Sequence, residues 1–247
     1  MALPKVSTPT YELTIPSTGE TVTYRPFLVK EEKTLLMAME SNSATAMSNA
    51  MRDIISSCTE GNLNVKTLAP FDLEFFFLQL RGRSIGDVIE VKISKPITLA
   101  CGDKDENCDQ VCEIPINIDE ITVDTSKISD PKLKLTDTIG VKMKYPEIDS
   151  VQKYAGTGEE DIKAENIFKM INDCVEYIWD GEEIFKAKDH SKKELTEFIE
   201  SLNTKQFNKI REFFESMPRL SHEITWKCPK CSKSTPMVLQ GIDSFFG

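Results

Sequence analysis

The sequence predicts an α+β fold, in which short β-hairpins and amphipathic helices occupy separate stretches of the chain. Three observations lead to this prediction. Apolar and polar residues alternate near the N-terminus, apolar residues at helical spacing follow, and two clusters of cysteines stand between β-prone segments. At 247 residues the chain is long enough for one large domain or two smaller ones.

The N-terminal part, residues 1–86, is expected to form a hairpin followed by helices. In TYELTIPSTGETVTYRPF, apolar residues alternate with polar ones, and PSTGE provides the turn. Helical spacing of apolar residues then predicts helices over LVKEEKTLLMAMES, ATAMSNAMRDIISSCT and APFDLEFFFLQLRGRSIG. The phenylalanines of the third helix, including Phe71 and Phe77, are expected to pack in the core, with an exposed aromatic patch as the alternative.

Residues 87–146 and 221–247 are expected to form one zinc-ribbon-like β lobe, built from two hairpins. The first cysteine cluster stands between the runs DVIEVKISKPITLA and VCEIPINI, and the second stands between SHEITW and TPMVLQG. Each cluster therefore falls at the predicted tip of a hairpin. After the first hairpin, the stretch up to Ile148 has the composition of short strands and turns.

The two cysteine clusters predict a structural Zn²⁺ site. Structural zinc takes four ligands in a tetrahedron, and cysteines separated by two residues can reach the same ion. Cys228 and Cys231 have this spacing, and Cys101 ends its strand as Cys228 does. The fourth ligand is Cys108 or Cys112, and the similar layout of CDQVCEI and CSKSTPM favours Cys108. The ion would then join two segments that are distant in the chain.

Other interpretations of the cysteines are a redox pair and a vestigial site without its ion. A redox pair would open a helix after a strand, whereas both flanks here are extended. A catalytic zinc is disfavoured, because it usually needs histidine ligands and the chain has two histidines, His190 and His222. Seven cysteines, an odd number, argue against a disulfide framework, and Cys58 and Cys174 are expected to be buried core thiols.

Residues 147–220 are expected to form a helical block that lies between the two cysteine clusters, although the whole chain could also form one compact unit. DIKAENIFKMINDCVEYIWDG is predicted to be a single helix, because its apolar residues recur at helical spacing. SKKELTEFIESL and TKQFNKIREFFESM predict two more helices, with Ser191 and Thr204 as N-caps and Pro218 after the last turn.

Composition and motifs argue against several classes of function. A net charge of −10 disfavours a surface that wraps nucleic acid, and no apolar run is long enough to span a membrane. The N-terminus lacks the pattern of a secretory signal, so synthesis in the cytosol is expected. No phosphate-binding loop, nucleophile elbow or H-E-x-x-H motif is present. The sequence therefore predicts a non-enzymatic interaction protein without a small-molecule substrate.

Four stretches together carry a resemblance to a known family: PTYELTIPSTGETVTYRPFLVKEEKTLLMAME, FDLEFFFLQLRGRSIGDVIEV, LTDTIGVKMKYPEI and WKCPKCSKSTPMVLQGIDSFF. They resemble the T-even-type (myovirus) bacteriophage baseplate protein family, which includes baseplate hub subunits and hub assembly proteins. The resemblance implies assembly of the hub of a contractile tail, through contacts with other hub or tail proteins, such as the tape-measure protein. It also implies that the protein acts in the host bacterial cytoplasm during assembly, and stays in the virion tail baseplate if it is retained.

Two alternatives to this function are a tail assembly chaperone absent from the mature virion, and a zinc-ribbon accessory factor that acts with nucleic acid. Lys227, Lys230 and Lys233 around the second cysteine pair support the latter, and the acidic first cluster opposes it. The leading candidates for an apolar contact surface are Phe245 and Phe246, with burial in this chain's own core as the alternative.

Overall fold

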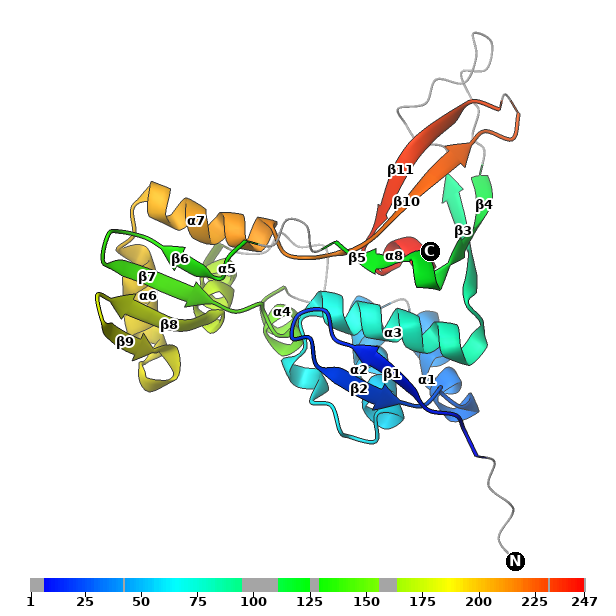
Figure 1. The fold of residues 1–247 in the computed structure, drawn as a ribbon, viewed down its shortest axis with the longest axis horizontal. Coiled ribbons are helices and arrows are strands. Elements are labelled where there is room, and N and C mark those ends of the chain that lie inside the picture. The colour runs from blue at the N-terminus through cyan, green and yellow to red at the C-terminus, as the bar shows by residue number, and fades with distance from the viewer. Residues whose placement is uncertain are drawn as a thin grey trace, which may run out of the picture. The chain divides into compact units, whose positions relative to one another are not determined.

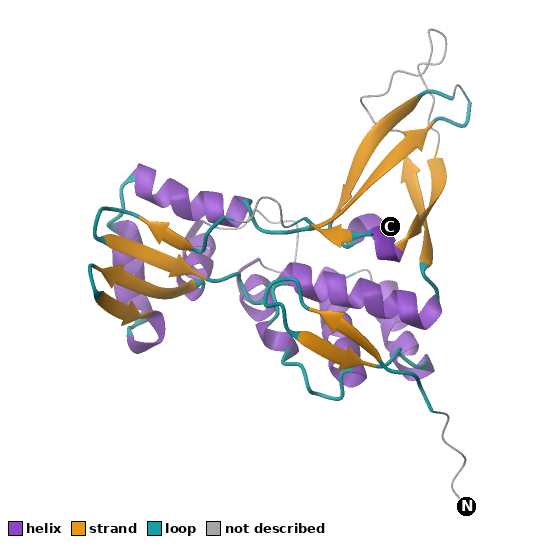
Figure 2. Ribbon diagram, viewed as in Figure 1, coloured by secondary structure: helices purple, strands orange, loops and turns teal. Residues whose placement is uncertain are grey.

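A computed structural model describes residues 7–41, 43–94, 111–124, 129–155, 164–230 and 232–246 of the chain (Figures 1 and 2). The chain divides into two compact units. The first comprises Met1–Val65, Phe71–Asp124 and Arg219–Gly247, and the second comprises Lys66–Pro70 and Thr125–Pro218. Helices and small antiparallel sheets occupy different stretches of the chain, so the predicted α+β class is confirmed.

The first unit begins with the predicted hairpin and helices. Strands β1 (Tyr11–Thr14) and β2 (Thr21–Tyr24) pair antiparallel. They are followed by α1 (Val29–Glu40), α2 (Ala44–Cys58) and α3 (Pro70–Ile85). The short 3-10 helix η1 (Val65–Thr67) precedes α3 in the chain and spans the boundary to the Lys66–Pro70 segment of the second unit. The apolar face of α3 is buried, with Phe71, Phe77 and Leu78 each at most 4% exposed, which confirms its predicted place in the core.

A buried ion pair fixes the start of α1. Glu31 is 4% exposed, and one of its oxygens accepts hydrogen bonds from Arg25 at 2.9 Å and from Ser57 on α2 at 2.7 Å. Its other oxygen accepts from the backbone N–H of Leu28 at 2.8 Å and so caps the helix. Burial by itself would raise the pKa of Glu31, but the hydrogen bonds from Arg25, Ser57 and Leu28 outweigh it and lower this pKa to about 2.

The remainder of the first unit is a lobe made of two hairpins, which we call the hairpin lobe. Its strands are β3 (Val88–Ser94), β4 (Val111–Asn117), β5 (Thr122–Val123), β10 (Leu220–Lys227) and β11 (Ser234–Gln240). Strands β3 and β4 form one sheet and β11-β10-β5 form another, with η2 (Ile118–Glu120) between β4 and β5. Both predicted hairpins are therefore present.

A single apolar core joins the two sheets of the hairpin lobe. Inward-facing residues of β3 and β4 pack with those of β10 and β11 and with α8 (Asp243–Phe246). Trp226 is fully buried there, and its indole N–H donates to the carbonyl oxygen of Ile93 at 3.2 Å. This hydrogen bond ties the second hairpin to the first across 133 positions of sequence.

The second unit is inserted into the hairpin lobe between β5 and β10. These two strands pair directly, with Leu220 opposite Val123 and Ser221 opposite Thr122. Just beyond this pairing, the N–H of Asp124 donates to the carbonyl oxygen of Arg219 at 3.0 Å. The chain thus leaves the lobe and returns to it at adjacent points.

A four-stranded antiparallel sheet with helices forms the second unit (Figure 1). The strand order is β6-β7-β8-β9, and the strands are β6 (Lys132–Lys134), β7 (Ile139–Met143), β8 (Val175–Asp180) and β9 (Glu183–Lys186). The helices are α4 (Ile148–Ala155), α5 (Ala164–Asp173), η3 (Ala187–Asp189), α6 (Lys192–Glu200) and α7 (Thr204–Glu215). Residues of α5, α6 and α7 pack with β7 and β8 in one core.

Three details of this unit correct the sequence-based expectations. The single helix predicted over residues 161–181 ends at Asp173, and β8 follows, because VEYIW is rich in β-branched and aromatic residues that favour strands. The expected helical block therefore contains strands, and its sheet joins residues on both sides of the boundary expected at 146. Ser191 caps α6 as predicted, but the N-cap of α7 is Asn203 rather than Thr204.

Candidate functional site

The second cysteine pair begins at the end of β10, in a tight turn. The N–H of Cys228 donates to the carbonyl oxygen of Lys233 at 2.8 Å, and the N–H of Ser232 donates to that of Cys228 at 2.9 Å. Ser232 has a φ of 59°, in the left-handed region that lets the chain reverse sharply. Cys228 is 1% exposed and belongs to the core of the hairpin lobe.

Cys112, from the first cluster, lies beside this turn. It is opposite Ile93 in the β3–β4 ladder, and its thiol donates to the carbonyl oxygen of Lys227 at 3.1 Å. Lys227 immediately precedes Cys228, so the structure brings one cysteine of each cluster to the same place in the fold. Cys101, Cys108 and Cys231 lie outside the described residues. Within the described part of the chain, no three histidine, cysteine, aspartate or glutamate side chains gather as a metal site would require.

The other two cysteines are core residues, as predicted. Cys58 and Cys174 are each at most 1% exposed. Burial raises the pKa of Cys58 to about 11 and that of Cys174 to about 12, so both remain protonated thiols. They are therefore unsuited to act as nucleophiles or metal ligands.

Phe245, which was a leading candidate for an apolar contact surface, is a core residue instead. It is 3% exposed and belongs to the core of the hairpin lobe, where α8 folds back toward the sheets. The backbone N–H of Phe245 donates to the carbonyl oxygen of Ile242 at 3.0 Å, which holds this short helix. The side chain of Phe246 is not among those that the structure describes.

A group of exposed apolar residues lies on α1, a helix that the sequence-based prediction did not single out as a contact surface. Leu35 and Ala38 of this helix are buried, whereas five apolar residues at or near it are exposed. Their exposed fractions are Leu28 41%, Val29 79%, Leu36 53%, Met37 61% and Met39 46%. We call these five residues the α1 surface. The signal in the sequence was the run LLMAM, which has more apolar residues than one buried face can hold.

None of the helices in the described ranges is both long and apolar enough to cross a membrane.

Comparison with known proteins identifies the class to which this fold belongs. The model of the T4 bacteriophage base plate protein family matches residues 8–247, and the chain belongs to that family. The resemblance seen in the sequence is thereby confirmed.

Among individual proteins, the chain is similar to the baseplate hub assembly protein gp26 of Enterobacteria phage T4. The two are 24% identical over 236 residues, which cover 96% of this chain and 97% of that protein. No solved structure matches the chain.

Proposed function

We propose that this protein assembles the baseplate hub of a contractile phage tail through protein–protein contacts, without catalysing a reaction. Membership of the baseplate family and similarity to a hub assembly protein along nearly the whole chain support this role. The partners would be other baseplate proteins, with the tape-measure protein as one candidate. The protein would meet them in the host cytoplasm, and mass spectrometry of purified virions would distinguish a retained subunit from a chaperone that leaves.

The α1 surface is the observation that best supports protein–protein contacts. Exposed apolar residues that cluster on one element mark interaction sites, and methionines adapt to the shape of a partner. Glu31 and its hydrogen bonds to Arg25, Ser57 and Leu28 hold the start of α1 rigidly, so the surface is ordered before a partner arrives.

A paired substitution tests this surface. We expect Leu36→Glu combined with Met37→Glu to reduce co-purification with co-expressed hub proteins of the same phage at least tenfold, because two carboxylates would be buried at the interface. Lys205→Glu, at an exposed residue of α7 in the second unit, changes the net charge by the same amount and serves as the control. Normal co-purification of the double variant, with an unchanged melting temperature, would reject the α1 surface as the contact.

We further propose that a structural zinc ion joins the two hairpins. Cys228 and Cys231 would supply two thiolates, and two of Cys101, Cys108 and Cys112 would supply the others. The turn at Cys228 and the position of Cys112 against Lys227 support this set. When bound, the ion would contribute its binding free energy to folding, which suits a protein that works without disulfides.

A further inference from the structure

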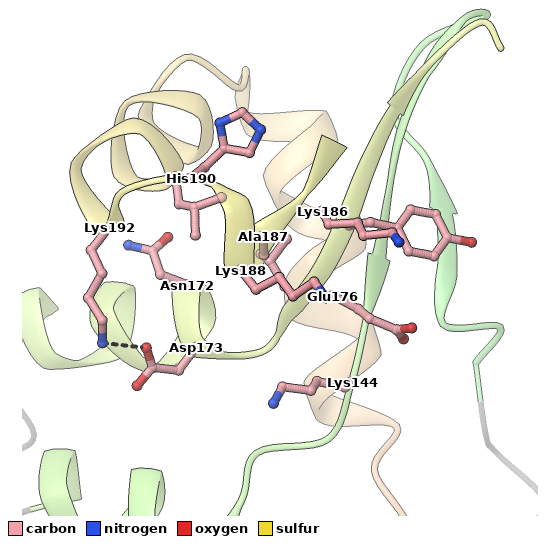
Figure 3. Close-up of a pocket in the computed structure, with 12 residues that line it drawn as sticks. Lys144, Asn172, Asp173, Glu176, Lys186, Ala187, Lys188, His190 and Lys192 are labelled. Atoms are coloured by element: carbon pink, nitrogen blue, oxygen red, sulfur yellow. Dashed lines mark hydrogen bonds and ion pairs between the residues drawn. The ribbon is translucent and has the colours of Figure 1, made fainter. Parts of the chain in front are cut away.

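Two of the cavities in the second unit adjoin each other and differ in character. The larger is about 600 Å³ in volume and lies between the end of α5, strand β8 and the connection from β9 to α6 (Figure 3). The smaller is about 270 Å³ and lies where β7, β8 and β9 meet α6. His190 and Leu195 line both cavities, so the two are neighbours within the same unit.

The larger cavity is basic, although the chain as a whole is acidic. Its two carboxylates are already neutralised, because Asp173 pairs with Lys192 at 2.8 Å and Glu176 pairs with Lys142 at 2.8 Å. Two further lysines of the lining, Lys186 and Lys188, have no ion pair or hydrogen bond to another side chain in the described residues. They leave uncompensated positive charge at the mouth of this cavity.

Asn172, which lines the larger cavity, carries a buried polar atom. Asn172 is 5% exposed, and its amide nitrogen donates to the hydroxyl of Thr196 at 2.7 Å. That hydroxyl itself donates to the carbonyl oxygen of Lys192 at 2.9 Å, so it must accept from Asn172, which fixes the orientation of the amide. The Asn172 carbonyl oxygen then has no hydrogen-bond partner in the described part of the chain.

The smaller cavity is apolar, and it opens beside a free sheet edge. Ile139, Ile178, Phe185 and Phe198 form its walls. Among the described residues, strand β9, which carries Phe185, pairs with β8 and with no other strand, so it forms an edge of this sheet. Ile184 on the same strand is 60% exposed.

From these features we infer that the two cavities bind an extended segment of a partner protein, in which an apolar side chain stands next to acidic residues. The apolar side chain enters the smaller cavity beside Phe185, and the carboxylates meet Lys186 and Lys188. Asp180 and Glu194 line the smaller cavity and would repel carboxylates there. The acidic residues of the partner segment are therefore favoured only at the larger cavity, next to Lys186 and Lys188. A polyphosphate chain fits less well, because it has no apolar group for the smaller cavity.

The inference adds a second contact to the assembly role, and it is tested separately from the α1 surface. The probe is a fluorescent ten-residue peptide with one phenylalanine followed by three aspartates, and binding to the full-length protein is measured by fluorescence anisotropy. We expect Lys186→Glu combined with Lys188→Glu to weaken binding at least tenfold, and Phe185→Ser to weaken it similarly. Lys132→Glu combined with Lys205→Glu makes the same charge change on exposed residues outside both cavities and should leave binding unchanged.

Three outcomes would overturn this inference. The first is no binding of the peptide to the wild-type protein at 100 µM peptide. The second is equal binding of the lysine variant and its control. The third is tighter binding of a single-stranded DNA probe that the same lysine variant abolishes, which would make the site a nucleic-acid surface. Variants of the α1 surface should bind the peptide normally, so failure of the hub-assembly role and failure of this inference give different results.

Discussion

Replacing Glu31 with glutamine should destabilise the first unit in a pH-dependent way. The substitution keeps the size of the side chain and one acceptor oxygen for the Leu28 N–H, but it removes the negative charge. Arg25, whose side chain is 14% exposed, would then be left without its charged partner. The difference in the free energy of unfolding between wild type and Glu31→Gln should therefore depend on the ionisation of Glu31.

The pKa of Glu31 sets the size and the pH range of the effect. A fall from its ordinary value of 4.5 to about 2 on folding corresponds to about 3 kcal/mol of stability, at 1.36 kcal/mol per pH unit. Because the pKa is lower in the folded protein, this stabilisation is fully present above pH 4.5. It is lost as the pH falls from about 4.5 to about 2.

Urea denaturation followed by circular dichroism, at several pH values between 7 and 2.5, measures the difference in the free energy of unfolding. We expect wild type to exceed Glu31→Gln by about 3 kcal/mol at pH 7 and by much less at pH 2.5, because Glu31 is then largely protonated in the unfolded chain. Other carboxyl groups titrate in both proteins, so their effects largely cancel in the difference. Glu32→Gln, one position along and exposed, should stay within about 0.5 kcal/mol of wild type. A difference below about 1 kcal/mol at pH 7, or one that persists unchanged at low pH, would refute this reasoning.

Three further predictions concern the hairpin lobe and the four-stranded sheet of the second unit. Elemental analysis should find about one zinc per chain, and Cys228→Ser should release it while Cys58→Ser retains it; zinc well below half an equivalent in fresh wild-type protein would reject the site. Trp226→Ala should lower the free energy of unfolding by about 3–5 kcal/mol, measured in urea, because a large buried side chain and its hydrogen bond are both lost. Gly140→Ala should lower the melting temperature, because a Cβ at this position would overlap the Trp179 ring. Adding Trp179→Ala to the Gly140→Ala variant should restore part of the loss. Equal melting temperatures for Gly140→Ala and wild type would argue against this packing.

Local patterns in the sequence predicted those elements whose signals are themselves local. The alternation around the first turn gave β1 and β2, and Ser191 with Glu194 three residues later gave the start of α6. The strand β8 was missed because Ile171, Cys174 and Ile178 continue a helical spacing through the point where the helix ends. Its strand state depends on pairing with β7, more than thirty positions away, and with β9 through a tight turn at Gly181. The Asp180-Gly181 dipeptide is a local hairpin signal that the sequence-based prediction did not use.

The candidate sites were predicted less completely than the fold. The spacing of Cys228 and Cys231 indicated a turn between two strands, which the fold contains, but spacing does not determine which cysteine of the first cluster faces that turn. For Phe245 the sequence left a contact surface and burial in the chain's own core as alternatives, and packing against the sheets buries it. The basic cavity combines Asn172, Lys186 and Lys188 from separate elements, so it becomes visible only in three dimensions.

The insertion of the second unit between β5 and β10 has a consequence for synthesis on the ribosome. When β3 and β4 leave the exit tunnel, the strands that complete their core have not yet been translated. At bacterial elongation rates the delay is on the order of 5–20 s. During that interval the inward faces of β3 and β4, with Ile89, Val91 and Ile116, would be open to solvent and to chaperones. If translation ended within the inserted unit, the truncated chain would lack β10 and β11, and the apolar faces of β3 and β4 would stay uncovered. Chaperones and proteases of the host would then recognise this chain as misfolded.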